Sequence, residues 1–335
     1  MRRSQTARAV PCKAAPKWEA LVLVAGVTGA SLPAFADEGG VAFWLSGQYA
    51  SLAAVPATPG ASAVLFPYYY SGSAGKSQIL PRGSLLTTGL DSQVALTLVQ
   101  VGYAPQEKLW GGQPYIGVSG GVGRNQTGVD ASASANTALQ LSAFDSKTGG
   151  TDLYPIASLA WNSGVHNWMT YVTGDIPVGA YDSKRLANLG IGHGALDAGG
   201  GYTYLDQSTG REWSAVAGLT YNLRNSDTDY KNGVDLHIDW AASQFLSANW
   251  QVGLVGYVYQ QISADQYPTT GIEGTLRSQV LGSFKSGIAS VGPELGYAFK
   301  VRNQQAYANL RAYWEFWAKN RIQGYAVMAT VSLPL

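Results

Sequence analysis

Two neighbouring runs of strict alternation, between residues 212 and 243, constrain the fold of this chain more than any other feature. In residues 212–223 the odd positions are apolar, as at Trp213 and Leu219, and the residues between them are mostly small or polar. In residues 235–240, Asp and His alternate with Leu, Ile and Trp. Side chains of a strand point alternately to opposite faces, so each run predicts a strand with one apolar and one polar face.

The length of these runs distinguishes two kinds of β-protein. Strands of a soluble sandwich usually have about 5 or 6 residues, and their apolar faces pack on a second sheet. Strands of about 9 to 11 residues, apolar outward and polar inward, are what a transmembrane barrel requires. Charged residues make up only 13% of the chain, against about 25% in soluble domains. No stretch after Ala36 can cross a bilayer as a helix, so we predict an all-β fold, a transmembrane antiparallel β-barrel.

The first 36 residues are typical of a signal peptide. Five basic residues precede and border a short apolar run, and residues 34–36 (AFA) form a cleavage site of small residues. A membrane anchor is the alternative, but Gly26 and Pro33 interrupt the run before the about 20 apolar residues that a spanning helix needs. Cleavage would remove five basic residues and one acidic residue, shift the formal net charge from +1 to −3, and remove Cys12, the single cysteine. The mature chain would then have no disulfide, thiol nucleophile or thiolate metal ligand.

Residues 37–60 do not alternate. Phe43 and Trp44 are followed by a Pro- and Ala-rich run, and prolines are disfavoured inside a sheet. The segment could be a first strand, but its aromatic side chains need burial. We expect a hatch-like segment in the barrel mouth or lumen, with Phe43 and Trp44 as its buried side chains.

The remaining residues, 61–335, divide into twelve candidate strands. These cover residues 61–71, 90–103, 113–124, 151–162, 167–178, 195–206, 212–223, 233–243, 249–260, 287–301, 306–317 and 324–335. An even number is expected for a bacterial barrel formed by one chain. Short and long connections alternate between the strands, and 14 strands also fit the pattern, so we predict a barrel of 12 to 14 strands.

The alternation assigns side chains to the lumen. The predicted lumen-facing residues, which we take as candidates for a substrate path, are Asp235, His237, Asp239, Tyr257, Tyr259, Glu294, Lys300, Tyr307, Arg311, Tyr313 and Glu315. Both signs of charge are present, so these groups could neutralise one another across the lumen. They could also line a permeation path in which tyrosines offer stacking surfaces and hydroxyls. The two interpretations are compatible.

The opposite parity points toward lipid. The predicted outward aromatic residues, near the ends of their strands, are Trp240, Trp250, Trp314, Phe316 and Tyr221. Such residues form girdles at the interfaces of a membrane. Outer-membrane lipid is therefore an expected partner. The barrel-insertion machinery is another, because it recognises the last strand of such barrels; that strand usually ends in an aromatic residue, and here it ends in Leu335.

Chemistry other than transport finds little support in the sequence. Asp235, His237 and Asp239 share a strand face, but no second His or Cys accompanies them at metal-ligand spacing, so no metal site is expected. A Ser/His/acid triad would have to be assembled from distant strands. A negative mature chain does not suggest nucleic acid. We predict no catalytic residue, no enzyme activity and no cofactor.

Several motifs in the second half of the chain carry a family resemblance. They include residues 168–181 (WMTYVTGDIPVGAY), 185–190 (RLANLG), 201–206 (GYTYLD) and 239–247 (DWAASQFLS). The chain resembles the SphA-type transporter family, also called the putative MetA pathway of phenol degradation family. Residues 42–45 are also loosely similar to the luminal hatch of long-chain fatty-acid and toluene channels.

The resemblance implies a bacterial outer-membrane barrel for passive uptake of small hydrophobic or aromatic compounds, linked to aromatic catabolism. Two alternatives stay open at this point. One is a structural or adhesive outer-membrane barrel that conducts nothing. The other is a secreted soluble β-protein.

Overall fold

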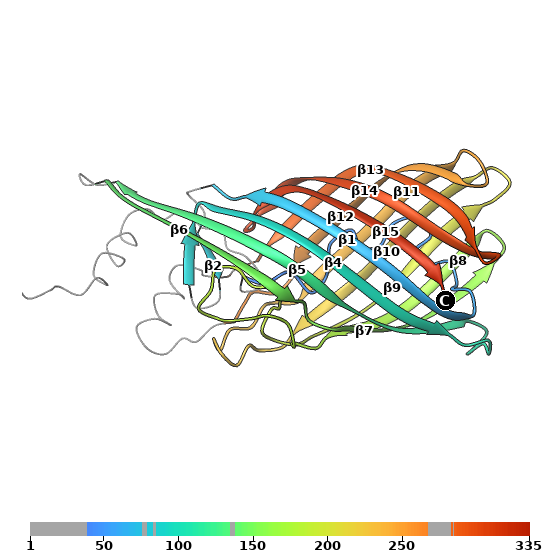
Figure 1. Ribbon diagram of the computed structural model, residues 1–335, viewed down its shortest axis with the longest axis horizontal. Helices are drawn as coiled ribbons and strands as arrows, with labels where there is room; N and C mark the ends of the chain where they lie inside the picture. The colour runs from blue at the N-terminus through green and yellow to red at the C-terminus, as the bar shows by residue number, and fades with distance from the viewer. Residues whose placement is uncertain (1–38, 76–78, 83–84, 135–137, 267–282, 284) are drawn as a thin grey trace, which may run out of the picture. The chain divides into compact units, whose positions relative to one another are not determined.

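Twelve antiparallel strands close into a barrel in the computed structural model, which describes residues 39–75, 79–82, 85–134, 138–266, 283 and 285–335 (Figure 1). The barrel strands are β1 (Gly60–Ser73), β4 (Leu90–Ala104), β5 (Gln113–Ser134), β7 (Tyr154–Ser163), β8 (His166–Asp175), β9 (Ala195–Asp206), β10 (Arg211–Asn222), β11 (Asp235–Phe245), β12 (Trp250–Gln261), β13 (Gly287–Val301), β14 (Gln304–Lys319) and β15 (Gln323–Pro334). Each strand pairs with the next, and β1 also pairs with β15, which closes the sheet. The predicted closed antiparallel barrel is confirmed.

Side chains alternate between lumen and exterior as the sequence predicts. On β10, Trp213 is 65% exposed and Leu219 48% exposed, whereas Ser214 and Thr220 are buried. The predicted outward residues Trp250 and Trp314 are also exposed on the barrel surface. The exterior is therefore apolar and the interior largely polar, which is the arrangement that lipid requires of a closed barrel.

The two ends of the barrel differ in their connections. At the short-turn end, where β1 begins and β15 ends, the strands are joined by short segments such as 164–165 and 207–210. At the long-loop end the connections include 176–194 and 223–234.

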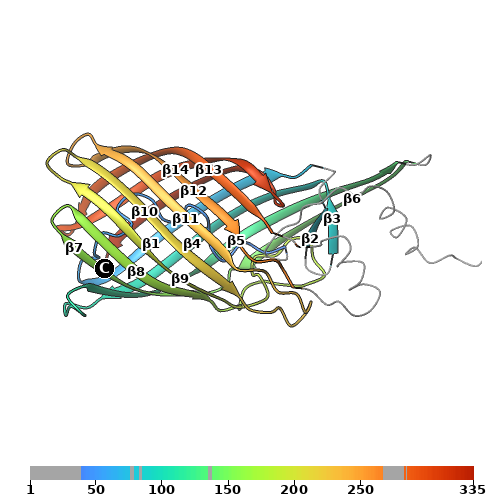
Figure 2. The ribbon, with the colours of Figure 1, turned by 180° about the vertical axis from the view of Figure 1, so that it is seen from behind.

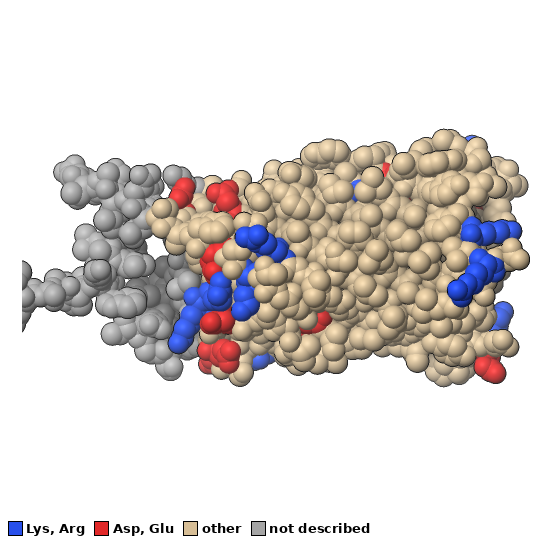
Figure 3. All heavy atoms as spheres, viewed as in Figure 1, with Lys and Arg blue, Asp and Glu red and all other residues tan. Residues whose placement is uncertain are grey.

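Figures 1 and 2 show the strands tilted against the long axis on both sides of the barrel. In Figure 3, charged residues gather near the two ends and the band between them is almost free of charge. No helix among the described residues is long and apolar enough to cross a bilayer.

The extension of β5 beyond the barrel was not predicted. The first part of β5 pairs with β7, and its second part pairs with an additional strand, β6 (Ala138–Gly150), which lies outside the closed ring. Between β6 and β7, Thr151 continues the ladder because its backbone N–H donates to the Gly121 carbonyl oxygen at 3.0 Å. The sequence between residues 124 and 150 lacks a sustained apolar alternation, since this hairpin does not face the lipid band.

Other bounds also need correction. The strand expected at residues 151–162 begins at Tyr154, and the strand expected at 113–124 continues to Ser134. A small separate hairpin, β2 (Ile79–Arg82) and β3 (Leu85–Thr88), lies in the connection between β1 and β4. The predicted signal peptide, residues 1–36, lies outside the described residues.

Candidate functional site

Residues 39–59, which we name the luminal segment, run inside the barrel toward β1. Gly39 lies at the long-loop end, where its carbonyl oxygen accepts a hydrogen bond from the Asn188 N–H at 2.9 Å. The segment then passes the middle of the lumen near Gly47 and reaches the short-turn end, where it joins β1 at Gly60. It forms no strand. Phe43 and Trp44, the predicted hatch residues, are 8% and 4% exposed.

The middle of the luminal segment is held at the peptide groups around Gly47. Asp239 of β11 accepts hydrogen bonds from the backbone N–H groups of Gly47 at 2.9 Å and Tyr49 at 3.2 Å. Arg311 and Tyr313 of β14 donate to the Gly47 carbonyl oxygen at 2.8 Å and 3.0 Å. Gly47 has a φ of 84°, and a Cβ there would lie 2.7 Å from Tyr313 Cζ. Glycine is therefore required at this position.

Two glutamates hold the part of the segment nearer the short-turn end. Glu294 of β13 accepts from the Ser51 hydroxyl at 2.6 Å, and Glu212 of β10 accepts from the Leu52 N–H at 2.9 Å. Glu212 is 0% exposed and also accepts from the Ser243 hydroxyl at 2.6 Å. A buried carboxylate needs such donors because removal of its charge from water is costly. We name the inner faces of β10–β14 the anchoring wall.

A second polar cluster fills the lumen nearer the long-loop end. The Glu315 carboxylate accepts from the hydroxyls of Tyr257 at 2.7 Å and Tyr70 at 2.8 Å. Asp235 accepts from the Tyr259 hydroxyl at 2.7 Å. These five side chains are all buried or nearly so. Their acids and hydroxyls satisfy one another, so this part of the lumen is packed.

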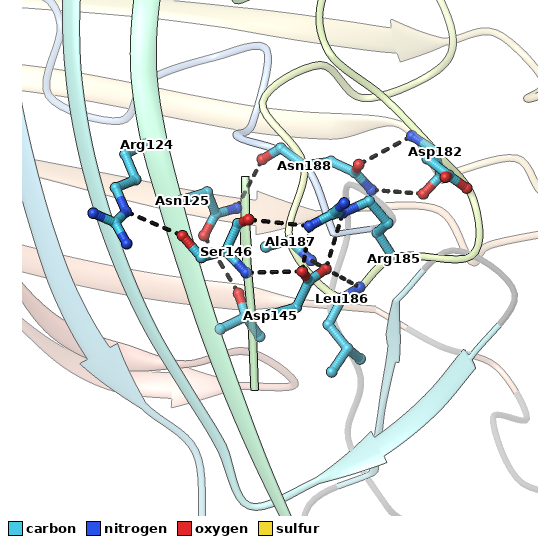
Figure 4. Close-up of polar contacts among 10 residues, drawn as sticks. Arg124, Asn125, Asp145, Ser146, Asp182, Arg185, Leu186, Ala187 and Asn188 are labelled. Atoms are coloured by element: carbon cyan, nitrogen blue, oxygen red, sulfur yellow. Dashed lines mark hydrogen bonds and ion pairs between the residues drawn. The ribbon is translucent and has the colours of Figure 1, made fainter. Parts of the chain in front are cut away.

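The loop at residues 176–194 folds over the long-loop end of the lumen. Ala187 and Asn188 are each 0% exposed. The Asn125 side chain of β5 donates to the Asn188 carbonyl oxygen at 2.8 Å (Figure 4). It also donates to the Gly39 carbonyl oxygen at 3.3 Å. One asparagine thus links the barrel wall, the loop and the luminal segment.

Asp145 of β6 fixes the same loop from its other side. Its carboxylate accepts from the backbone N–H groups of Leu186 at 3.1 Å and Ala187 at 3.2 Å, and it forms an ion pair with Arg185 (Figure 4). Burial alone would raise the pKa of Asp145, but hydrogen bonds from the Ala187 N–H, Arg185 and the Ser146 N–H outweigh it and lower the pKa. The side chain is therefore ionised at neutral pH and holds the loop through its charge.

An open cavity lies beside the luminal segment. It has a volume of about 430 Å³ and is bounded by β14, β15, β1, β4, β5 and β7. We name the inner faces of β15, β1, β4, β5 and β7, which lie across the cavity from the luminal segment, the cavity wall. Phe66, Leu98, Tyr115 and Ile156 line it together with Gln and Ser side chains. Among the described lining residues, Arg311 is the one charged side chain, and it is bound to the luminal segment. The cavity therefore presents an almost uncharged surface of mixed polarity.

The predicted lumen residues separate into distinct places. Those that face the interior are Asp235, His237, Asp239, Tyr257, Tyr259, Glu294, Tyr307, Arg311, Tyr313 and Glu315. Lys300 has the inward parity but lies at the short-turn end, where it is exposed. Of the whole set, Tyr307 and Arg311 line the cavity. A role in a substrate path stays a prediction for all of them.

Several interior residues escape the sequence analysis. Glu212 anchors the luminal segment, Asp197 of β9 binds His237, and Asn125 links the loop to Gly39. Glu212 follows the same even parity as the polar positions of β10, so the alternation could have identified it. Asp197 and Asn125 lie beside glycine-rich runs whose alternation is too weak to assign a face.

One solved outer-membrane channel supports this architecture. The COG4313 outer membrane channel from Pseudomonas putida F1 is similar in structure, with a TM-score of 0.63 and 12% sequence identity over 83% of this chain and 97% of that chain. At that identity the likeness concerns the fold. The beta domain of the Bordetella autotransporter BrkA gives a TM-score of 0.42 at 12% identity, over 82% of this chain and 100% of that chain. No curated protein matches the sequence.

The sequence itself identifies the family. A family model described as "Putative MetA-pathway of phenol degradation" matches residues 71–331. The match runs from the end of β1 into β15, so it spans nearly the whole barrel. Closed antiparallel barrels with an apolar exterior belong to the outer membranes of bacteria. The chain is therefore a bacterial outer-membrane β-barrel, and it belongs to the family described as the putative MetA-pathway of phenol degradation.

Proposed function

We propose that this barrel is a passive channel for small, uncharged hydrophobic or aromatic compounds. The observation that carries the proposal is the cavity of about 430 Å³ beside the luminal segment. Its volume lies within the range of about 300 to 1,000 Å³ that is usual for sites of small molecules. The description of the family, which refers to phenol degradation, agrees with an aromatic cargo.

The lining of the cavity favours neutral molecules over ions. Aromatic rings such as Phe66, Tyr115 and Tyr154 offer apolar contact, and Gln100 and Ser158 offer hydrogen bonds. An ion in this space would lose water and meet few compensating charges, which is costly. Transfer of a small phenol from water costs much less free energy, because the walls replace both its apolar and its polar contacts.

The position of the cavity indicates at which end of the barrel the route is open and at which end it is closed. It extends to Pro59 and Pro334 at the short-turn end, which faces the periplasm if the usual arrangement of bacterial barrels applies. Toward the outside, the lumen is closed by the packed cluster around Glu315, by the loop at residues 176–194 and by the first part of the luminal segment. Entry thus requires movement of these groups, and transport follows the concentration gradient without chemical change.

The experiment compares ions with neutral solutes on the purified mature protein. Conductance is measured in a planar bilayer, and the entry of phenol and of a sugar is measured in liposomes. We expect little steady ion conductance and accelerated entry of phenol. Steady ion conductance together with rapid sugar entry would contradict the proposal and indicate an open aqueous pore.

A non-conducting structural or adhesive barrel is the alternative. The β5–β6 extension favours it, because this hairpin lies outside the closed ring and offers a strand edge for contact with another surface. No steady ion conductance and no accelerated entry of sugar or phenol would support this alternative.

A further inference from the structure

The indole of Trp44 packs against aromatic side chains of the barrel wall, in a place that we name the slot. Its ring centroid lies 3.6 Å from that of His237 on β11, with an interplanar angle of 22°. On β8, Tyr171 lies 5.8 Å away at 27°. Trp44 is 4% exposed, and His237 and Tyr171 are 1% and 3% exposed. The luminal segment thus places one flat ring among rings of the wall.

The slot is fixed by residues of the wall. His237 Nε2 lies 2.7 Å from Asp197 Oδ2, and the Thr220 hydroxyl also donates to this carboxylate. Gly218 makes room for the rings, because a Cβ there would lie 2.1 Å from the Tyr171 hydroxyl oxygen and 2.6 Å from His237 Cε1. These contacts come from the wall alone, so they hold the imidazole in one orientation independently of Trp44.

The indole satisfies the shape of the slot but not its hydrogen bonds. Trp44 Nε1 and His237 Nδ1 are enclosed, and neither has a hydrogen-bond partner among the described residues. Nε2 of His237 faces Asp197, so Nδ1 is the ring nitrogen left for a ligand. Indole brings a donor that makes no hydrogen bond there. Buried groups without partners are unfavourable, so a ring carrying a hydroxyl, which can donate or accept, would suit the slot better.

We propose that the slot formed by His237 and Tyr171 binds an aromatic ring bearing a hydroxyl group, and that Trp44 is its internal competitor. This inference rests on the proposed function and specifies its cargo. A phenolic compound that displaces Trp44 also removes a contact that seats the luminal segment, three residues before the anchor at Gly47. The transported compound then loosens the cover of its own route.

The test measures ligand binding by calorimetry on the mature protein in detergent. The probes are phenol, cyclohexanol, which keeps the hydroxyl but not the aromatic ring, and benzene, which keeps the ring but not the hydroxyl. Trp44→Ala removes the competitor, so it should bind phenol about tenfold more tightly than the wild type. It should bind cyclohexanol and benzene at least about tenfold more weakly than phenol. Trp110→Ala is the matched control, because this side chain is 84% exposed in a turn, and it should behave as the wild type.

Three outcomes overturn the inference. The first is equal binding of phenol by Trp44→Ala and the wild type. The others are equal binding by Trp44→Ala of phenol and cyclohexanol, and of phenol and benzene. If Trp44→Ala does not fold, the wild type carries the test: saturating phenol should make Trp44 accessible to a fluorescence quencher. Trp44→Phe identifies the signal of Trp44, and no change in quenching would refute the proposal.

Failure of the slot and failure of the channel give different results. Phenol entry into liposomes without ring-selective binding refutes the slot and leaves the channel. Ring-selective binding in Trp44→Ala without accelerated phenol entry supports the slot and refutes the channel.

Discussion

The anchoring wall and the cavity wall are built from strands of the same barrel, but their inner faces differ in charge. Asp239, Glu294 and Arg311 lie on the anchoring wall, and each binds the luminal segment. The cavity wall presents Phe66 and Leu98 with uncharged polar groups. Buried charges require partners, and the luminal segment supplies them with backbone groups and the Ser51 hydroxyl. A wall without charges has no such requirement, so residues 47–52 lie against the anchoring wall and leave space beside the cavity wall.

The strength of this asymmetry follows from its hydrogen bonds. A hydrogen bond to a charged group contributes about 1.5 to 3 kcal/mol to stability. The luminal segment makes several of them with Asp239, Glu212 and Glu294. The state in which the luminal segment is bound to the anchoring wall should therefore dominate at rest. Substitutions on each of the two walls can test the difference between them.

Removal of residues 39–59 should have the largest effect. Without the luminal segment the lumen loses its main filling, so steady ion conductance should rise by at least about tenfold. Planar-bilayer recordings of the mature protein with and without the segment measure this change, and heat-dependent gel mobility checks that the barrel has folded. An unchanged conductance in a folded barrel would mean that other residues close the lumen.

Gly47→Ala should unseat the middle of the segment without removing it. The new Cβ would clash with Tyr313 at a φ of 84°, a strain of about 1 to 3 kcal/mol. Brief ion-conducting openings should become about 5 to 100 times more frequent in single-channel recordings. Gly111→Ala is the matched control, because its φ is 76° and a Cβ there would meet nothing within 4 Å. Equal behaviour of the two variants would show that the clash with Tyr313 is unimportant.

Ser158→Asp places a charge on the cavity wall and should have a smaller effect. Its side chain lines the cavity, and a carboxylate there is hydrated and occupies space that a neutral ring would use. Phenol entry into liposomes should fall by about threefold to tenfold, with ion conductance nearly unchanged. Ser163→Asp, on the same strand but exposed at the short-turn end, serves as the control. Equal phenol entry in the two variants would argue against a route along this wall.

Asp145→Asn should have the smallest effect, confined to the loop at residues 176–194. The pKa of Asp145 is lowered in the folded protein, so its contribution is present above a pH of about 4 and is lost as the pH falls through the folded-state pKa. At neutral pH the variant should show faster hydrogen exchange at Leu186 and Ala187 than the wild type. The difference should vanish under acidic conditions, when the wild-type carboxyl is protonated. A difference that persists there would assign the effect to something other than charge.

The barrel could be predicted from the sequence because the alternation of apolar and polar residues recurs along most of its strands. The alternation on β10 and β11 fixed the facing of residues such as Trp213 and Asp239, and the even strand count followed from length and turns. The interior arrangement was less accessible. The alternation along each strand indicates that Asp239 and Phe66 both point inward. It does not indicate which wall the luminal segment contacts, because that depends on pairs of residues far apart in the chain.

The β6 strand shows a different limit. Residues 138–150 carry no lipid-facing stripe, because this strand pairs with the extension of β5 outside the closed ring. A search for amphipathic strands therefore passes over it. Trp44 was predicted to be buried, but its partner His237 could be found only when the fold brought residues 193 positions apart into contact.

The course of the luminal segment also governs how the barrel can assemble. Its anchors join residues separated by 160 to 264 positions in the chain, and contacts of such long range form slowly. Arg311 belongs to β14, and the seam between β15 and β1 closes the ring directly beside it. If residues 39–59 lie in place before that seam is complete, they need not be threaded into a closed ring. We therefore expect the wall to assemble around this segment, with the order of folding set from the inside.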